Sequence, residues 1–218
     1  MIVYFISGLG ADERAFRYIK LPSVEKRFIR WIPPLHNESL KEYTARLIVQ
    51  IDTTRPVTLV GLSFGGIVAQ AMAEIIACER VFLISCVKSP NELSWGLRLI
   101  RRTKMYGLLP LRGLKPLALR LAPYWFDAVS DRQKGLLKNI INDTDEVFAR
   151  WAIGALMCWQ GSRITAPLIH LHGTGDRIFP IRYVRNYTPI KGGGHFMVVT
   201  HARKISKLLQ HHLNPVTL

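Results

Sequence analysis

Short hydrophobic runs recur toward both ends of the chain. They occupy residues 2–6, 28–32, 57–60, 81–84, 167–171 and 187–190. The first run stops at a glycine-rich turn, residues 7–10, as expected of a buried parallel strand. The pattern predicts six strands.

Between these runs, hydrophobic residues recur at helical spacing. Asp12 is a candidate N-cap for a helix that continues to Ile19, and Ser39 with Glu42 forms a capping-box pattern. Further helices are predicted over residues 40–51, 67–75 and 205–213. Strands that alternate with helices predict an α/β fold with a doubly wound, mostly parallel sheet of about six strands.

The alternation stops between Val87 and Gly161. Residues 95–100, 136–141 and 147–156 have helical patterns with no strand between them, and Asp143 with Glu146 resembles a cap before the last. Four prolines are expected to mark turns: Pro90, Pro110, Pro116 and Pro123. We therefore predict an α/β core, residues 1–86 and 162–218, with a helical cap inserted at 87–161, before the last two strands.

Composition adds limits to this picture. The chain has 218 residues, of which 49% are hydrophobic and 21% charged, which is typical of a globular protein. Neither a secretory signal nor a stretch long enough to cross a bilayer is expected. The three cysteines are scattered, which favours neither a disulfide framework nor a zinc site and indicates a reduced, cytoplasmic setting.

The net charge of +15 is unusual, and it is concentrated in the insertion. Between Lys88 and Arg120 there are eight basic residues and one acid, Glu92. This segment could be a solvated surface, could attract an anionic substrate, or could contact an anionic membrane through interleaved leucine and tryptophan side chains. Nucleic-acid binding is not expected, because no recognition motif accompanies the charge.

The chemistry is concentrated at Gly61-Leu62-Ser63-Phe64-Gly65, which lies between a predicted strand and a predicted helix. Gly-x-Ser-x-Gly in that setting is a nucleophile elbow, a tight turn that exposes a serine hydroxyl. Such a serine needs a base, and the base needs an orienting carboxylate. His195 after three glycines and Asp176 in Gly173-Thr174-Gly175-Asp176 follow the last two strands, where ligands bind in such sheets.

Other interpretations of these residues stay open. Asp176 could be a turn residue, in which case Glu92 is the alternative acid. His170 and His172 lie on one face of a strand, but no partnering acid or cysteine cluster supports a metal site, so structural roles are favoured. The large aromatic residues of the insertion are expected mostly in the core, with some of them covering the serine: Trp95, Trp125, Phe126, Trp151 and Trp159.

The order Ser63, Asp176, His195 resembles the α/β-hydrolase fold family over essentially the full length, apart from the insertion. The resemblance implies that Ser63 attacks an acyl carbon, that His195 transfers the proton and that Asp176 holds the imidazole. It also implies an oxyanion hole formed by the backbone N–H groups of Leu9 and Phe64.

Two features depart from the family pattern. Ser7-Gly8 stands where many relatives carry His-Gly, and the first strand corresponds to the third strand of the family's full sheet. Neither change affects the three side chains proposed for catalysis.

The sequence thus predicts a serine hydrolase that cleaves a carboxylic ester, thioester or related small acyl substrate through an acyl-enzyme on Ser63, without a metal or organic cofactor. One alternative is a lyase-type enzyme that uses the same residues. Another is a non-catalytic protein that binds anionic surfaces. The sequence leaves the oligomeric state open.

Overall fold

The computed structural model describes residues 1–108 and 110–213, without the side chains of residues 108, 111 and 112. Its centre is a six-stranded sheet in the order β2-β1-β3-β4-β5-β6, with parallel pairing throughout. The strands are β1 (Ile2–Ile6), β2 (Glu25–Ile29), β3 (Val57–Leu62), β4 (Cys78–Ile84), β5 (Leu168–Gly173) and β6 (Thr188–Ile190). The predicted fold class is confirmed.

The second strand lies three residues earlier than the hydrophobic run at 28–32 predicts. β2 is an edge strand, so charged residues such as Glu25 and Arg27 can occupy it with their side chains toward solvent. Ile32 is held outside the sheet by Tyr43, whose hydroxyl donates to the Ile32 carbonyl at 2.8 Å and accepts from its N–H at 3.2 Å. Both backbone polar groups of Ile32 are therefore satisfied by a side chain and not by a neighbouring strand.

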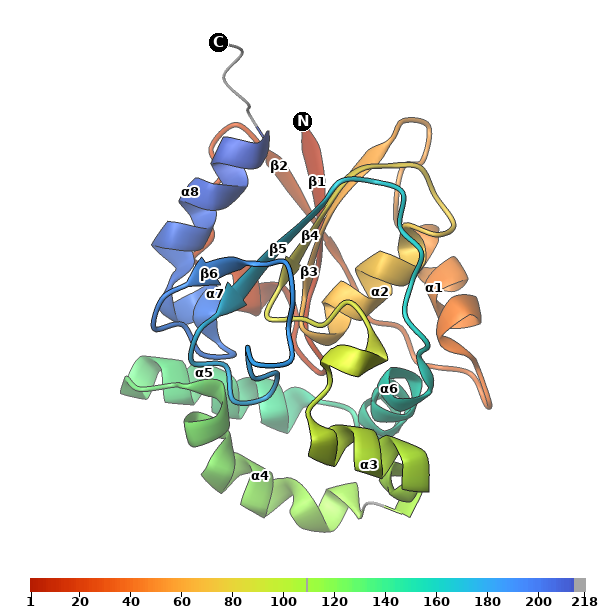
Figure 1. Cartoon of the computed structure of the whole chain (residues 1–218), viewed down its shortest axis with the longest axis vertical. Helices are drawn as coiled ribbons and strands as arrows, with labels where there is room; N and C mark the ends of the chain where they lie inside the picture. Colours follow the sequence, from red (N-terminus) through yellow and green to blue (C-terminus); the bar gives the residue numbers. More distant parts are fainter. Residues whose placement is uncertain (109, 214–218) are drawn as a thin grey trace.

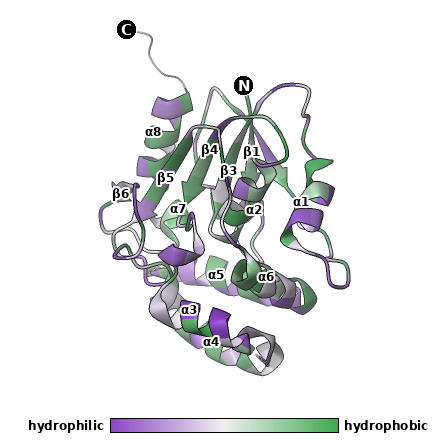
Figure 2. Cartoon of the chain, turned by 45° about the vertical axis from the view of Figure 1, so that its right-hand side comes forward, coloured by the Kyte–Doolittle hydropathy of each residue, from purple (hydrophilic) through white to green (hydrophobic). Residues whose placement is uncertain are grey.

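Helices cover both faces of the sheet (Figure 1). α1 (Leu40–Ile48) and α2 (Phe64–Met72) lie on one face, and α8 (Ala202–Leu213) follows the short α7 (Met197–Thr200) on the other. Alternate residues of β1 serve the two cores: Val3 and Phe5 pack on the α8 side, and Tyr4 and Ile6 on the α1–α2 side. Figure 2 shows the strands as the hydrophobic centre.

The predicted N-terminal helix is shorter than its pattern suggests. Asp12 does act as its cap and accepts a hydrogen bond from the Arg14 N–H, but the element is a 3₁₀ helix, η1 (Glu13–Phe16). The capping box of Ser39 and Glu42 at the start of α1 is confirmed.

Residues 87–161, hereafter the insertion, hold α3 (Trp95–Thr103), α4 (Leu111–Phe126), α5 (Asp131–Asp143) and α6 (Glu146–Cys158). Short 3₁₀ helices, η2 (Pro90–Glu92) and η3 (Met105–Leu108), flank α3. Asp145 caps α6, so the predicted cap at Asp143 is wrong: Asp143 ends α5 and pairs with Arg14 at 2.7 Å.

The prediction that Pro116 and Pro123 mark turns is also wrong, because both lie inside α4. A proline removes one intrahelical hydrogen bond and usually kinks or breaks a helix, at about 3 kcal/mol. Here packing opposes that cost: Ala122 is buried, and Phe126 packs on the core. Tertiary contacts therefore keep a helix that local preference would interrupt.

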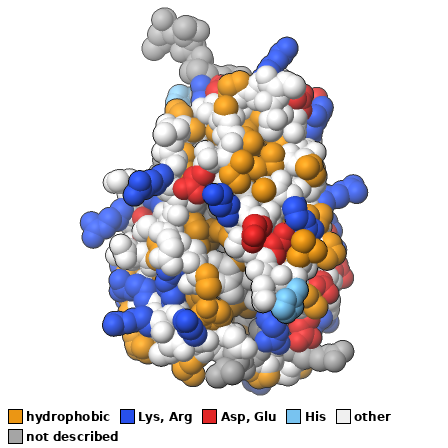
Figure 3. Space-filling model, turned by 90° about the vertical axis from the view of Figure 1, so that its right-hand side faces the viewer, with side chains coloured by type: hydrophobic (Ala, Val, Ile, Leu, Met, Phe, Trp, Pro, Cys, Tyr) orange, Lys and Arg blue, Asp and Glu red, His pale blue; other side chains and the backbone are white. Residues whose placement is uncertain are grey.

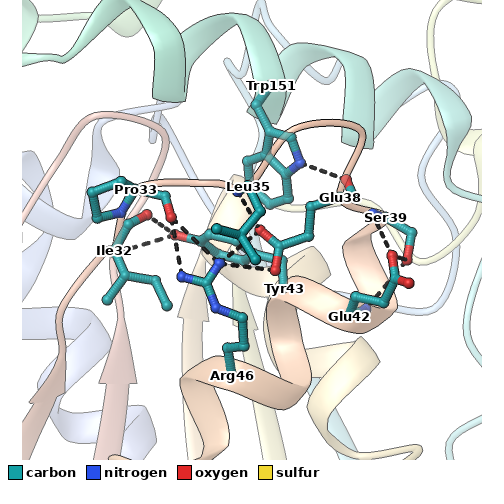
Figure 4. Close-up of polar contacts among 9 residues, drawn as sticks. All are labelled: Ile32, Pro33, Leu35, Glu38, Ser39, Glu42, Tyr43, Arg46 and Trp151. Carbon is teal, nitrogen blue, oxygen red and sulfur yellow. Dashed lines mark hydrogen bonds and ion pairs between the residues drawn. The ribbon is translucent and has the colours of Figure 1, made fainter.

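α6 is fixed to the core by a polar network around Tyr43 (Figure 4). The Trp151 indole N–H donates to the Glu38 carbonyl at 2.8 Å, and the Glu38 carboxylate pairs with Arg46 of α1 at 2.9 Å. The Trp151 ring lies 4.0 Å from the Tyr43 ring. On the side of the molecule that Figure 3 turns toward the viewer, hydrophobic side chains alternate with charges of both signs.

Among the described residues, no helix has the length and hydropathy to cross a membrane.

Candidate active site

Ser63 lies in the predicted tight turn between β3 and α2. Its backbone has φ 52° and ψ −119°, a left-handed conformation that costs energy outside glycine. A Cβ on Gly61 would overlap the backbone of Gly66, and a Cβ on Gly65 would overlap backbone carbonyls at the end of β1. Side chains are therefore excluded at positions 61 and 65, and the turn holds the Ser63 hydroxyl at the end of the sheet.

The three predicted side chains are linked by two consecutive hydrogen bonds. His195 Nε2 lies 2.9 Å from Ser63 Oγ, and His195 Nδ1 lies 2.8 Å from Asp176 Oδ2. His195 and Asp176 are both buried. Because a carboxylate can only accept, Nδ1 carries the proton and Nε2 is left with a lone pair facing the serine hydroxyl.

Asp176 is held in place by the turn that follows β5. Its other oxygen, Oδ1, accepts hydrogen bonds from the N–H groups of Ile178 at 2.9 Å and Phe179 at 2.8 Å. Burial alone would raise the pKa of Asp176, but the electrostatic attraction and hydrogen bond of His195, the nearby His172 and the Phe179 N–H together lower it below its ordinary value. Asp176 therefore stays ionised.

Glu92, the alternative acid, lies elsewhere. Its carboxylate accepts from the backbone N–H groups of Lys88 at 2.7 Å and Arg185 at 3.1 Å. It joins two loops and has no described contact with His195, so the geometry favours Asp176.

His170 and His172 of β5 form a buried layer behind Asp176. His172 Nε2 donates to the Phe179 carbonyl at 2.8 Å, which leaves its Nδ1 to accept from His170 Nε2 at 3.2 Å. The Phe179 ring packs edge-on against His195, with ring centroids 5.4 Å apart. Both histidines thus support the loop that carries the acid. No group of three potential metal ligands occurs among the described residues.

The buried histidines predict a pH dependence of stability. Burial, with the charge of His172, lowers the pKa of His170 to about 3, so its ring stays neutral in the folded protein while the unfolded chain binds a proton below about pH 6.5. The free energy of unfolding should fall by about 2–3 kcal/mol between pH 7.5 and pH 4.5 from this residue alone. His170→Asn should flatten that slope in urea titrations; an unchanged slope would assign the acid sensitivity to other groups.

The two residues predicted to form the oxyanion hole border the same cavity. Leu9 and Phe64 line the cavity that contains Ser63, and no hydrogen bond within the described part of the chain uses either N–H. The loop after β1 is fixed at Ala11, whose carbonyl accepts from Ser7 Oγ at 2.5 Å and from the Trp31 indole at 3.0 Å. Ser7 therefore orders the loop without occupying a backbone donor.

Ser63 and His195 open into a cavity of about 760 Å³. Core residues form its base, and α3, α4, α5 and α6 of the insertion contribute most of its walls. Among the described lining residues, Lys115 and Glu146 are the only lysine, arginine, aspartate or glutamate. A larger hollow of about 1390 Å³ lies on the other side of α6, but Ser63, Asp176 and His195 do not line it.

The C-terminal end of α4 meets the loop that carries the base. The Phe126 carbonyl accepts from the Phe196 N–H at 3.0 Å, and the Phe126 ring packs edge-on against His195 at 5.3 Å. Asp127 lies so close to Gly194 that a Cβ there would overlap it. The sequence pattern does not predict this contact, because it predicts no helix over residues 111–126.

Comparison with known families agrees with this geometry. A model of the alpha/beta hydrolase family matches residues 3–208. The chain belongs to this family. No curated protein matches its sequence significantly.

Several solved structures share the alpha/beta hydrolase fold with this chain. A bromoperoxidase from Bacillus anthracis has a TM-score of 0.75 at 19% identity, over 97% of this chain and 91% of that one. An esterase from Exiguobacterium antarcticum has a TM-score of 0.74 at 16% identity, over 98% and 91%. A hydrolase from Oleispira antarctica has a TM-score of 0.70 at 18% identity, over 97% and 90%. At these identities the likeness shows the fold alone.

Proposed function

We propose that the protein is a serine hydrolase that cleaves carboxylic esters through an acyl-enzyme on Ser63. The observation that carries this proposal is the string from Asp176 through His195 to Ser63, at hydrogen-bond distances and open to a largely apolar cavity. The similarity to a family that contains hydrolases supports it.

The geometry supports a two-step reaction. Ser63 Oγ attacks the carbonyl carbon while its proton passes to His195 Nε2, and Asp176 stabilises the imidazolium that forms. The carbonyl oxygen takes up negative charge near the Leu9 and Phe64 N–H groups, and Phe64 begins α2, whose helix dipole favours that charge. His195 returns the proton to the departing alcohol. A water molecule then repeats the sequence on the acyl-enzyme and releases the acid.

The cavity favours an apolar acyl group over a charged one. A buried carboxylate would need paired cations, and Lys115 is the only basic side chain among the described lining residues apart from His195. Lys115 already donates to the Asn142 carbonyl at 3.0 Å. We therefore expect a hydrocarbon acyl chain to be preferred in this mainly apolar cavity, and the anionic-substrate alternative has less support.

A labelling experiment and an ester series test the proposal. A fluorophosphonate should modify Ser63, with the site confirmed by mass spectrometry of the labelled peptide. Among nitrophenyl esters, kcat/KM should rise by up to about fourfold per added methylene until the cavity is filled, and succinyl esters should be poor substrates. No labelling, or a preference for the charged esters, would contradict it.

Product analysis separates hydrolysis from lyase chemistry. In water enriched with oxygen-18, a hydrolase incorporates the heavy oxygen into the released acid. Turnover without incorporation would favour the lyase alternative on the same three residues.

A further inference from the structure

The outer sides of α3 and α4 expose an unusual amount of hydrophobic surface. More than half of the exposed large hydrophobic residues in the described part of the chain lie between residues 95 and 129. On α3 these include Trp95, 64% exposed, and on α4 Tyr124, 62% exposed. The large aromatic residues of the insertion are expected mostly in the core, but Trp95 and Trp125 are exceptions, because both are exposed on helices whose opposite sides face the cavity.

The exposed residues of α4 form a continuous stripe. Leu117, Leu121 and Trp125 follow at four-residue intervals, so they lie on one side of the helix. Ala118 and Phe126, offset from them by one position, line the cavity. α4 is thus hydrophobic on two sides: one side lines the cavity, and the other faces away from the rest of the described protein. Soluble proteins rarely leave such a stripe without a binding role.

The charges beside this stripe have one sign. From Leu93 to Phe126 the sequence contains seven basic residues and no acid. Arg102, Lys104 and Arg120 are exposed, and none of them forms an ion pair with a described residue. The side chain of Arg112, which belongs to the same basic stretch, lies outside the described residues.

α3 and α4 together form one end of the molecule. They lie at the end opposite the N-terminus (Figure 1), and α4 is outermost in the turned view (Figure 2). At the lower left of Figure 3, basic and hydrophobic side chains lie next to one another. We call this surface the α3–α4 face, defined by Trp95, Leu99, Arg102, Lys104, Leu117, Arg120, Leu121, Tyr124 and Trp125.

We propose that the α3–α4 face docks on an anionic lipid surface. Basic side chains attract acidic headgroups, while tryptophan, tyrosine and leucine insert at the boundary of the hydrocarbon. A second copy of this chain is a poorer occupant, because the pairing of two such faces would bring like charges together. The docking does not depend on Ser63 being catalytic, so it can be tested in a chain without the serine hydroxyl.

The face would also place the cavity beside the membrane. α3 and α4 contribute Ile100 and Ala118 to the cavity wall, and both residues are exposed. A lipophilic ester could then pass from the bilayer to Ser63 without crossing bulk water. This second step rests on the proposed function, whereas the docking itself does not.

Vesicle sedimentation of the full chain carrying Ser63→Ala tests the docking. The protein should partition at least about a hundredfold more strongly onto phosphatidylcholine vesicles with about a third phosphatidylglycerol than onto phosphatidylcholine alone. Added salt should weaken the binding. Equal partition onto both vesicles would overturn the proposal.

Two triple variants that remove the same charge distinguish binding through the α3–α4 face from attraction by the overall positive charge. Arg102→Gln with Lys104→Gln and Arg120→Gln should lower partition by about a hundredfold, at about fivefold per removed charge. The control Lys20→Gln with Arg55→Gln and Lys207→Gln removes the same charge from exposed sites outside the insertion. Equal losses in the two variants would mean attraction by overall charge and would overturn the proposal.

A third variant tests the hydrophobic stripe. Leu117→Ser with Leu121→Ser and Trp125→Ser should also reduce vesicle binding, with thermal unfolding used to confirm that each variant is folded. Light scattering should find the same oligomeric state in all of them. A dimer that dissociates in this variant would instead assign the face to a second copy. With Ser63 intact, the charge variants should still cleave a soluble short ester. If neither the parent protein nor any variant cleaved that ester, the result would count against the proposed function and leave the docking proposal unaffected.

Discussion

Ser63→Ala should lower kcat/KM for a nitrophenyl ester by at least about 10⁴-fold. The substitution removes the hydroxyl oxygen that lies 2.9 Å from His195 Nε2, while the tight turn keeps its shape because alanine can occupy the same backbone. Initial rates with active-site titration would measure the loss, and circular dichroism would confirm folding.

A matched control distinguishes the role of Ser63 from a general effect. Ser23→Ala removes an exposed hydroxyl near α8, outside the cavity, and should leave turnover unchanged. Activity within tenfold of the parent in Ser63→Ala would remove Ser63 from the mechanism and with it the acyl-enzyme.

Asp176→Asn should lower kcat by about 10³–10⁴-fold with little change in KM. The N–H groups of Ile178 and Phe179 fix the oxygen of the new side chain on their side. Its amide nitrogen would then face His195 Nδ1 and force the imidazole proton onto Nε2. A protonated Nε2 can no longer accept the proton of Ser63.

Glu92→Gln is the matched control for this carboxylate. Glu92 joins the backbones of Lys88 and Arg185, so the variant should lose some thermal stability and keep kcat. If Glu92→Gln lost kcat and Asp176→Asn did not, the two acids would exchange roles.

The site was predictable because its chemistry depends on local patterns. The elbow requires glycines around Ser63, and the acid and base must follow strands that end at the same edge of the sheet. Parallel pairing then brings Ser63, Asp176 and His195 together from distant positions. The catalytic roles remain predictions for the variants above to test.

The insertion was less predictable because its packing opposes local preference. α4 contains Pro116 and Pro123, which favour a break, and its helix is retained by contacts that no local pattern encodes. The exposure of Trp95 and Trp125 was missed for a related reason. Hydrophobicity predicts burial only when the side of the helix that faces the core is known.

The contact between the C-terminal end of α4 and the loop that carries His195 limits how much of the insertion can be exchanged between relatives. A chimera that exchanges the helices upstream of Tyr124 keeps the Phe126 carbonyl bonded to Phe196 and the Arg177 guanidinium bonded to the Tyr124 carbonyl. One that also replaces residues 124–127 removes the support on one side of His195. A transplanted segment should therefore leave residues 124–127 of this chain in place, whatever substrate specificity the transplanted helices confer.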